Sequence, residues 1–192
     1  MFYFLSRDLL GKFLFTQFGN VVTGGMIVET EAYRAPEDRA SHAYGNKRTK
    51  RNAVMFNAGG ICYVYCCYGL HSLFNVVTNL EGIPHAILIR AIEPVEGIPE
   101  MLGRRKRAKL DYSLTNGPGS LAQALGITTQ HNGMSLTGSQ IWIEERNYTT
   151  PQDSIIASPR VGVDYAGQDA LLPWRFRIKD NRWTSKSRSF KM

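Results

Sequence analysis

Short apolar runs bounded by turn residues follow one another along this chain, and such runs predict β-strands. The clearest run lies at 26–33, which is rich in β-branched residues, alternates in part, and contains neither glycine nor proline. The further strands that we expect are 61–69, 74–78, 86–91, 141–143, 160–163 and 174–178. Successive strands without a regular strand–helix alternation favour an α+β domain with mainly antiparallel pairing.

Helical patterns occupy less of the chain. A short helix that leads into a strand is expected within 5–19, a second helix at 97–109, and a third at 120–125. The sequence shows no internal repeat, no low-complexity segment and no linker that would divide it. The pattern therefore predicts a single domain that spans residues 1–192.

Two acidic residues, Glu29 and Glu31, stand out in the strand at 26–33. They are two positions apart, so an extended backbone places both carboxyl groups on the same face. Burying a carboxyl group is costly without partners, so such a pair needs either solvent or a function. The functional interpretation is a general base that activates water, beside a second acid paired with a cation or a backbone donor. Spacing leaves open which acid has which role, and a solvated face is an equal alternative.

Aromatic residues crowd a second segment. Tyr63 and Tyr65 share one face of the predicted strand, and Tyr68 projects beyond its end, next to Gly69. Tyrosine rings beside cations suit stacking on nucleic-acid bases. Packing in the core is the competing interpretation, and an aromatic stripe at period two favours it.

Two loops carry further candidates. The polar segment 34–50 leads into a basic cluster made of Lys47, Arg48, Lys50 and Arg51, and long loops of this composition commonly have a function. The stretch 115–121 contains three successive small or rigid residues, Gly117-Pro118-Gly119, which allow a ligand to approach the backbone closely. A plain turn is the simpler interpretation of that stretch.

Charge narrows the choice of partner. The chain has 23 Lys and Arg against 16 Asp and Glu, a formal net charge of +7, which favours polyanions without proving nucleic-acid binding. Its apolar opening is too short for a membrane span. The three cysteines, Cys62, Cys66 and Cys67, have neither disulfide nor zinc spacing, so buried, reduced thiols in an intracellular protein are expected.

An ordered set of motifs resembles the 3-methyladenine DNA glycosylases of the alkyladenine, or methylpurine, type. The resemblance covers nearly the whole chain, in the same order. Its segments are 27–33, Pro36-Glu37-Asp38 with Ala40 and His42, Arg51-Asn52 with Met55-Phe56, Tyr63-Val64-Tyr65 with Tyr68-Gly69, Asn75, Leu88 with Arg90-Ala91, Glu93-Pro94, Glu96-Gly97, Gly117-Pro118, Leu121, Gln123-Ala124-Leu125, Arg160-Val161-Gly162-Val163, Ala166-Gly167, Arg175-Phe176 and Trp183.

The resemblance implies a role for particular residues. Glu31 matches the general base that activates the attacking water, and Arg90 matches a residue beside that water and its base. Tyr33, His42 and Tyr65 match the walls of a pocket that sandwiches an extruded base, where His42 also offers a hydrogen bond.

Further matches concern selectivity and DNA. Asn75 matches a residue that disfavours guanine by clashing with its exocyclic amine, and Tyr68 matches the side chain that fills the gap left by the flipped nucleotide. Contacts with the DNA backbone are expected from the basic loop and from the Gly-Pro-Gly stretch, although Ser120 stands where the family can carry lysine. The expected DNA-contacting residues are Tyr68, Arg48, Lys50, Arg51, Gly117 and Ser120.

The resemblance also implies a fold and a reaction. The fold is a single mixed α+β domain on a curved, mainly antiparallel sheet with surrounding helices and a protruding β-hairpin. The reaction is base-excision repair: flipping of alkylated or deaminated purines, such as 3-methyladenine and 7-methylguanine, out of duplex DNA and hydrolysis of the N-glycosidic bond. No lysine matches a Schiff-base nucleophile, so a monofunctional enzyme that leaves an abasic site is expected. We expect no metal, no cofactor and a monomer.

Two other functions remain open at this point. One is a non-catalytic binder of damaged or distorted DNA, for which a buried acid beside phosphates would only weaken affinity. The other is formyl transfer, for which a related fold is the only argument.

Overall fold

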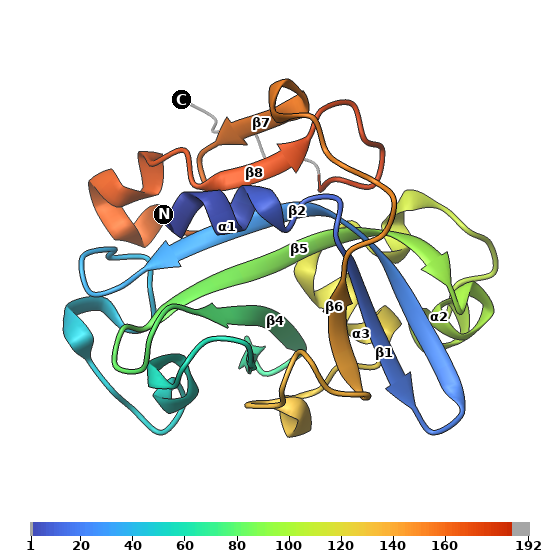
Figure 1. The fold of residues 1–192 in the computed structure, drawn as a ribbon, viewed down its shortest axis with the longest axis horizontal. Coiled ribbons are helices and arrows are strands. Elements are labelled where there is room, and N and C mark those ends of the chain that lie inside the picture. The colour runs from blue at the N-terminus through green and yellow to red at the C-terminus, as the bar shows by residue number, and fades with distance from the viewer. Residues whose placement is uncertain (1, 186–192) are drawn as a thin grey trace.

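A long strand, β2 (Val21–Arg34), organises the molecule (Figure 1). The computed structural model describes residues 2–185. The first half of β2 pairs with β1 (Phe13–Phe18), and residues Glu29 to Glu31 pair on the same edge with β8 (Arg175–Ile178). On its other edge β2 pairs with β5 (His85–Glu96) along most of its length. The segment that carries the two acids is therefore held on both edges.

The described residues form one domain around this sheet, which has eight strands and only antiparallel pairings. The sheet order is β3–β4–β5–β2–β1–β6, with β7 and β8 branching from β2. The remaining strands are β3 (Cys62–Cys67), β4 (His71–Thr78), β6 (Ile141–Glu144) and β7 (Ile155–Ser158). The expected α+β class with an antiparallel sheet is confirmed.

Three α-helices accompany the sheet: α1 (Phe2–Asp8), α2 (Ile98–Arg105) and α3 (Pro118–Leu125). Figure 1 shows α1 in front of β2 and α3 behind the strands. Proline in the first turn starts both α2 and α3, and left-handed residues, Lys106 and Gly126, end them. Six 3₁₀ segments complete the described elements: Tyr44–Asn46, Ala53–Phe56, Tyr112–Leu114, Thr129–His131, Gln152–Ser154 and Asp164–Leu171.

One predicted strand is wrong. Residues 160–163 are irregular, and the strand of this region is β7, which ends at Ser158. The valines at 161 and 163 suggest an extended segment, but Gly162 between them has a φ of 75°, outside the strand region. The basic helix is also shorter than expected, because α2 ends at Arg105 and not at Lys109.

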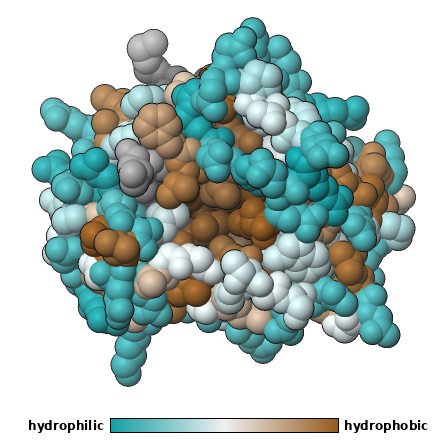
Figure 2. All heavy atoms as spheres, viewed as in Figure 1, coloured by the Kyte–Doolittle hydropathy of each residue, from teal (hydrophilic) through white to brown (hydrophobic). Residues whose placement is uncertain are grey.

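The main core lies between the sheet and the helices, and it includes Ile27, Val28, Phe74, Ile87 and Leu121, each fully buried. Over residues 2–185 no helix is long and apolar enough to cross a membrane. The view in Figure 2 shows a hollowed apolar area near the centre of this face, framed by hydrophilic residues.

A two-stranded hairpin, β3 with β4, ends in a tight turn whose tip is exposed. Tyr68 and Gly69 at the turn both have positive φ, 51° and 69°, and the Leu70 amide donates to the Cys67 carbonyl at 3.1 Å, as in a type I′ turn. The Tyr68 side chain is 91% exposed. The predicted projection of Tyr68 beyond the strand is confirmed.

Candidate active site

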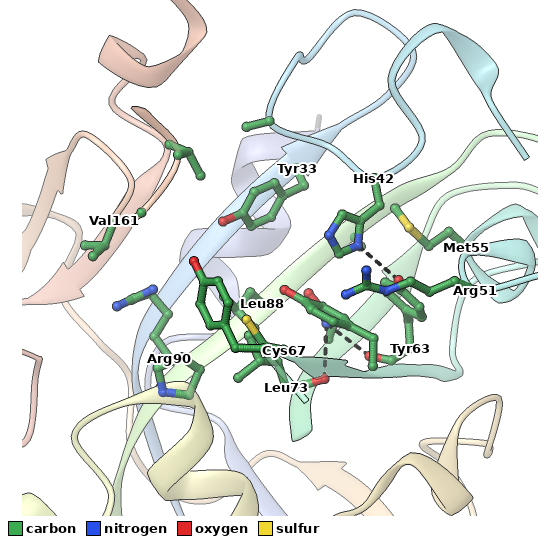
Figure 3. Close-up of a pocket in the computed structure, with 18 of the residues that line it drawn as sticks. Tyr33, His42, Arg51, Met55, Tyr63, Cys67, Leu73, Leu88, Arg90 and Val161 are labelled. Atoms are coloured by element: carbon green, nitrogen blue, oxygen red, sulfur yellow. Dashed lines mark hydrogen bonds between the residues drawn. The ribbon is translucent and has the colours of Figure 1, made fainter. Parts of the chain in front are cut away.

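A cavity of about 400 Å³ opens between the hairpin, the loop after β2 and the segment 161–165. Arg90 and Val161 lie on one side of it, His42 and Arg51 on the other, and Tyr33 between them (Figure 3). The predicted residues that line it are Tyr33, His42, Arg51, Tyr65, Tyr68, Asn75 and Arg90. Residues from five separate parts of the sequence thus meet at one cavity.

The two acids are not part of the cavity lining but bond to three residues that are, Tyr33, Arg90 and Val161. The Glu29 and Glu31 side chains are both fully buried, so the solvated-face alternative is wrong. Both contact the same guanidinium, which confirms that they project to the same side of β2. Arg90 Nε donates to Glu29 at 2.8 Å, and Arg90 Nη1 donates to Glu31 at 3.2 Å.

Arg90 reaches both acids because the sheet register is irregular there. Between β2 and β5, Glu29 faces Ala91 and Thr30 faces Ile89, so Arg90 has no partner residue in the register. Extra residues of this kind re-aim a side chain. Burial alone would lower the pKa of Arg90, but Glu31 and Glu29 raise it above its ordinary value. Arg90 therefore stays a cation between two carboxyl groups.

Glu29 is held by the most donors. In addition to Arg90, it accepts from Arg175 Nε at 2.7 Å and from the amide and hydroxyl of Ser185. Burial would raise the pKa of this carboxyl, but Arg90, Arg175 and the Ser185 amide together lower it. Four donors, three of them at Oε1, already engage this carboxylate, so it has less capacity to bind a water than Glu31 and is suited to anchoring Arg90.

Glu31 has a different set of partners. It accepts from the Tyr33 hydroxyl at 2.9 Å, from the Val161 amide at 2.8 Å and from Arg90. A carboxylate offers about four acceptor positions, so about one remains for a further donor. Burial, followed by the Glu31 charge, raises the pKa of Tyr33 well above its ordinary value. Tyr33 therefore keeps its proton and donates to Glu31.

A second buried ion pair supports Tyr33 from behind. Arg160 donates two hydrogen bonds to Asp38, and both side chains are fully buried. The Arg160 guanidinium lies 4.8 Å from the centre of the Tyr33 ring and 5.0 Å from that of Trp174. It also donates to the Ala32 carbonyl at 2.9 Å. These contacts fix the ring of Tyr33 and the start of the segment that presents the Val161 amide.

The tyrosine stripe serves both the core and the cavity. Tyr63 is buried in a small apolar cluster, while the partly buried Tyr65 packs on it with ring centres 5.3 Å apart and 28° between the planes. Arg51 lies 4.9 Å from the centre of the Tyr65 ring. Core packing is therefore correct for Tyr63, and Tyr65 combines packing with a place in the cavity wall.

His42 lies beside these rings. Its ring contacts Tyr65 edge-on, with centres 4.6 Å apart, and its Nδ1 lies 3.0 Å from the Tyr63 hydroxyl. Burial and then the Arg51 charge lower the pKa of His42 to about 4. Burial also raises the pKa of Tyr63 to about 12. Both groups are consequently neutral at pH 7, and the histidine adds no positive charge to the cavity.

Asn75 is oriented by the backbone of the hairpin. It is 4% exposed, and its Nδ2 donates to the Tyr63 carbonyl at 3.0 Å. That bond fixes the orientation of the amide group of Asn75, which is one of the residues that line the cavity.

The predicted DNA-contacting residues fall into two groups. Arg51 lines the cavity and donates to the Cys66 carbonyl at 3.1 Å, whereas Arg48 is exposed and lies over the Phe56 ring, and Lys50 is exposed. Ser120 lies in α3, where its hydroxyl accepts from Arg105 at 2.9 Å. Their contact with DNA stays a prediction.

Gly117 caps α3 with an extended backbone, and the adjacent Pro118 lines the cavity. A Cβ on Gly119 would lie 3.0 Å from two atoms of His71, so this glycine permits α3 to pack closely on the hairpin. The glycine-rich stretch therefore has at least a packing role, in agreement with the simpler interpretation.

The sequence patterns did not identify several residues of the site. Arg160, Arg175, Ser185 and the Val161 amide each bond directly to an acid of the network or to Asp38. Arg160, Val161 and Arg175 belong to the motifs quoted above, but nothing in their spacing indicated these contacts. A backbone amide leaves no signal in a sequence.

The described residues offer few groups for metal binding or thiol chemistry. Within 2–185 no three His, Cys, Asp or Glu side chains gather closely enough to hold a metal ion. All three cysteines are free thiols, but only Cys62 is buried, whereas Cys66 is exposed on the hairpin and Cys67 lies in the cavity lining. The expectation of buried thiols is thus correct for Cys62 and wrong for Cys66.

Comparison with known proteins gives concordant results. The sequence matches the family model described as methylpurine-DNA glycosylase (MPG) over residues 3–182. A relative from Chlamydia felis is 49% identical over 176 residues, which cover 91% of this chain and 89% of the relative. A relative from Bacillus cytotoxicus is 43% identical over 190 residues, with coverage of 95% and 93%. Both relatives are named "Putative 3-methyladenine DNA glycosylase".

Proposed function

This chain belongs to the methylpurine-DNA glycosylase family and is a DNA glycosylase for alkylated purines, and from that premise we propose that it hydrolyses the N-glycosidic bond of a flipped purine with a water activated by Glu31. The observation that carries the proposal is the surroundings of Glu31. Its carboxyl lies directly behind the cavity wall, since its three donors, Tyr33, Arg90 and the Val161 amide, all belong to lining residues, and about one acceptor position remains for a water.

The reaction needs one proton acceptor and one place for positive charge. The water oxygen forms a bond to C1′ of the sugar as the bond from C1′ to the base nitrogen breaks. The electron pair of the breaking bond goes to the base. The water proton goes to Glu31. An alkylated purine that carries a positive charge leaves as a neutral base, so no acid is required for its departure. General base catalysis of this kind contributes about 10²–10⁴-fold.

Arg90 orients the base of this reaction and does not accept a proton. Its raised pKa keeps it charged, and Glu29, Arg175 and Ser185 fix its position. The negative charges of Glu29 and Glu31 balance the positive charges of Arg90 and Arg175. A sugar with oxocarbenium character therefore faces Glu31 without an excess of positive charge from Arg90.

Tyr33, His42 and Tyr65 bind the flipped base. Flipping costs a few kcal/mol, and stacking contributes about 1–3 kcal/mol per base, so the rings offset the cost. A cationic purine gains about 0.5–2 kcal/mol more from the tyrosine faces. Because His42 is neutral and Asp38 neutralises Arg160, neither opposes a cationic base. Arg51 leaves the Tyr65 ring when a base stacks there, and a DNA phosphate then holds its guanidinium.

Two further residues select the base and open the duplex. Asn75, held by the Tyr63 carbonyl, faces the 2-amino group, which guanine has and adenine lacks. Tyr68, at the exposed tip of the hairpin, enters the duplex and occupies the place of the extruded nucleotide. Substrates are alkylated purines such as 3-methyladenine and 7-methylguanine; the latter has the same 2-amino group as guanine, and its positive charge, which makes it a better leaving group, offsets the clash with Asn75. The product is an abasic site in double-stranded DNA.

The direct experiment measures base release from duplexes that each carry one lesion: 3-methyladenine, 7-methylguanine, hypoxanthine or ethenoadenine. We expect free base and an abasic site from the alkylated duplexes, without a covalent protein–DNA adduct after borohydride reduction. A protein that binds these duplexes and releases no base would be a non-catalytic binder of damaged DNA. A borohydride-trapped adduct would contradict the water mechanism.

A further inference from the structure

A second cavity, of about 560 Å³, lies on the other side of the buried ion network. Ser185 forms part of its wall, and the same residue bonds to Arg90, which lines the first cavity. The two cavities also approach each other at the start of α3, where Asn116 lines the second and Pro118 the first. One thin wall of residues therefore separates them.

The second cavity is basic. Arg177, from β8, and Arg182, from the segment after it, line this cavity together with Asn116, Asn181 and Thr184, and no acidic residue among the described ones is part of the lining. Neither arginine forms an ion pair with any of the residues 2–185. The nearby Glu93 carboxyl is engaged with Asn181 Nδ2 at 2.9 Å.

Arg177 has an unused donor inside the protein. Its Nε is buried and has no hydrogen-bond partner among the described residues. Arg175, two residues earlier on the same strand, differs: its Nε bonds to Glu29 and its Nη2 to Ser185. Buried donors are nearly always satisfied, and of the five unpartnered buried side-chain atoms within 2–185 only Arg177 Nε belongs to a residue that lines either cavity, so it is the donor that a bound anion would satisfy.

We propose that the cavity around Arg177 and Arg182 binds a phosphate group of the DNA strand that carries the lesion. Paired guanidinium groups match the planar, bidentate recognition of phosphate, and the amides and hydroxyl of the lining supply further donors. A DNA strand has one phosphate for each 3.4 Å or so of helix axis, so a strand whose nucleotide enters the first cavity passes within reach of the second. This inference rests on the proposed function of the first cavity.

The subsite fixes the register of the strand. A phosphate held at Arg177 and Arg182 lies against the wall that contains Ser185, so it sets the position of the sugar relative to Arg90 and Glu31. Phosphate contacts position a protein on DNA and carry no sequence information. The expected effect of losing the site is therefore weaker binding to every duplex, with or without a lesion.

The test is the salt dependence of DNA affinity for Arg177→Gln, Arg182→Gln and the double variant. Each phosphate contact contributes about 0.9 to the slope of log affinity against log salt. Because both arginines hold the same phosphate, we expect the slope to fall by about 0.9 for the double variant and by part of that for each single variant. Lys179→Gln is the matched control, because Lys179 is an exposed cation next to the same strand but outside the lining, and its slope should equal the wild-type slope.

A second arm identifies the phosphate. Neutral methylphosphonate linkages are placed one at a time beside the lesion, and one position should weaken wild-type binding without weakening the double variant further. If inorganic phosphate stabilises the wild type against heat while the DNA slope is unchanged in the double variant, the site takes free anions and the DNA assignment is wrong. An unchanged slope with no phosphate effect refutes the site altogether.

Base release in the same preparations separates this inference from the proposed function. If the wild type releases no base, the proposed function fails. If the wild type releases base but the double variant keeps the wild-type slope, only the subsite fails.

Discussion

Replacing Asp38 with asparagine isolates the role of the buried Arg160–Asp38 pair. Both side chains are fully buried, and the carboxylate accepts four donors: two from Arg160, the Ala40 amide at 2.9 Å and the Arg34 amide at 3.2 Å. Asparagine has nearly the same shape, but its NH₂ group faces donors where an oxygen accepted before. The substitution therefore leaves a buried guanidinium without its counter-charge.

The magnitude follows from burial. Removing one partner of a buried ion pair costs about 3–5 kcal/mol. For a domain of this size, 1 kcal/mol corresponds to a shift of about 2–4 °C in Tm, so the melting temperature should fall by about 6–20 °C. The matched control is Glu100→Gln, which breaks the Arg104–Glu100 pair on α2. That pair is 19% and 45% exposed, and its loss should cost only about 0.3–0.5 kcal/mol.

The assay is urea unfolding at pH 7, followed by tryptophan fluorescence and by circular dichroism. Base release at a temperature where the variant stays folded should also be slower, because Arg160 supports Tyr33 and precedes the Val161 amide that bonds to Glu31. If Asp38→Asn loses no more stability than Glu100→Gln, the pair does not stabilise this wall of the cavity and the reasoning is wrong.

Three further outcomes are expected. Tyr68→Ala should change the free energy of unfolding by less than about 0.5 kcal/mol, because the side chain is exposed, while base release from duplex DNA slows more than release from a single strand. As the pH falls from 6.5 to 4, the free energy of unfolding should decrease, because His42 stays neutral in the folded protein, with a pKa of about 4, while it binds a proton in the unfolded chain. Urea unfolding of His42→Gln should lack this part of the pH dependence. Ser185→Ala should reduce the rate of base release more than the affinity for DNA, since it removes the hydroxyl that bonds to Glu29, Arg90 and Arg175. Ser185→Thr, which keeps a hydroxyl, should restore the rate. An equal loss of rate and affinity, or no rescue by threonine, would assign Ser185 a structural role only.

The sequence predicted the backbone of the site better than its contacts. Period-two spacing correctly placed Glu29 and Glu31 on one side of β2, and Tyr63 with Tyr65 on one face of β3. Local patterns determine these features, since the alternation belongs to the strand itself. The burial of both acids could not be read in this way, because it depends on Arg90 and Arg175 from distant strands.

The segment 160–163 shows why the remaining contacts were hidden. Its two valines indicate a strand, yet the structure uses it as an irregular wall, with Gly162 at positive φ and the Val161 amide donating to Glu31. Arginine side chains usually lie at the surface, yet the Arg160 side chain is fully buried. Long-range pairing decides both features, and the family resemblance indicated only that the segment matters.

The central claim is that Glu31 accepts the proton of the attacking water, and one measurement tests it most directly. Single-turnover base release from a duplex with one 7-methylguanine is compared for the wild type and Glu31→Gln, with DNA affinity measured in parallel and the exposed Glu145→Gln as the carboxylate-to-amide control. We predict a loss of about 10²–10⁴-fold in rate for Glu31→Gln, with affinity retained and Glu145→Gln like the wild type. A Glu31→Gln variant that binds the duplex and releases base at the wild-type rate would contradict the account.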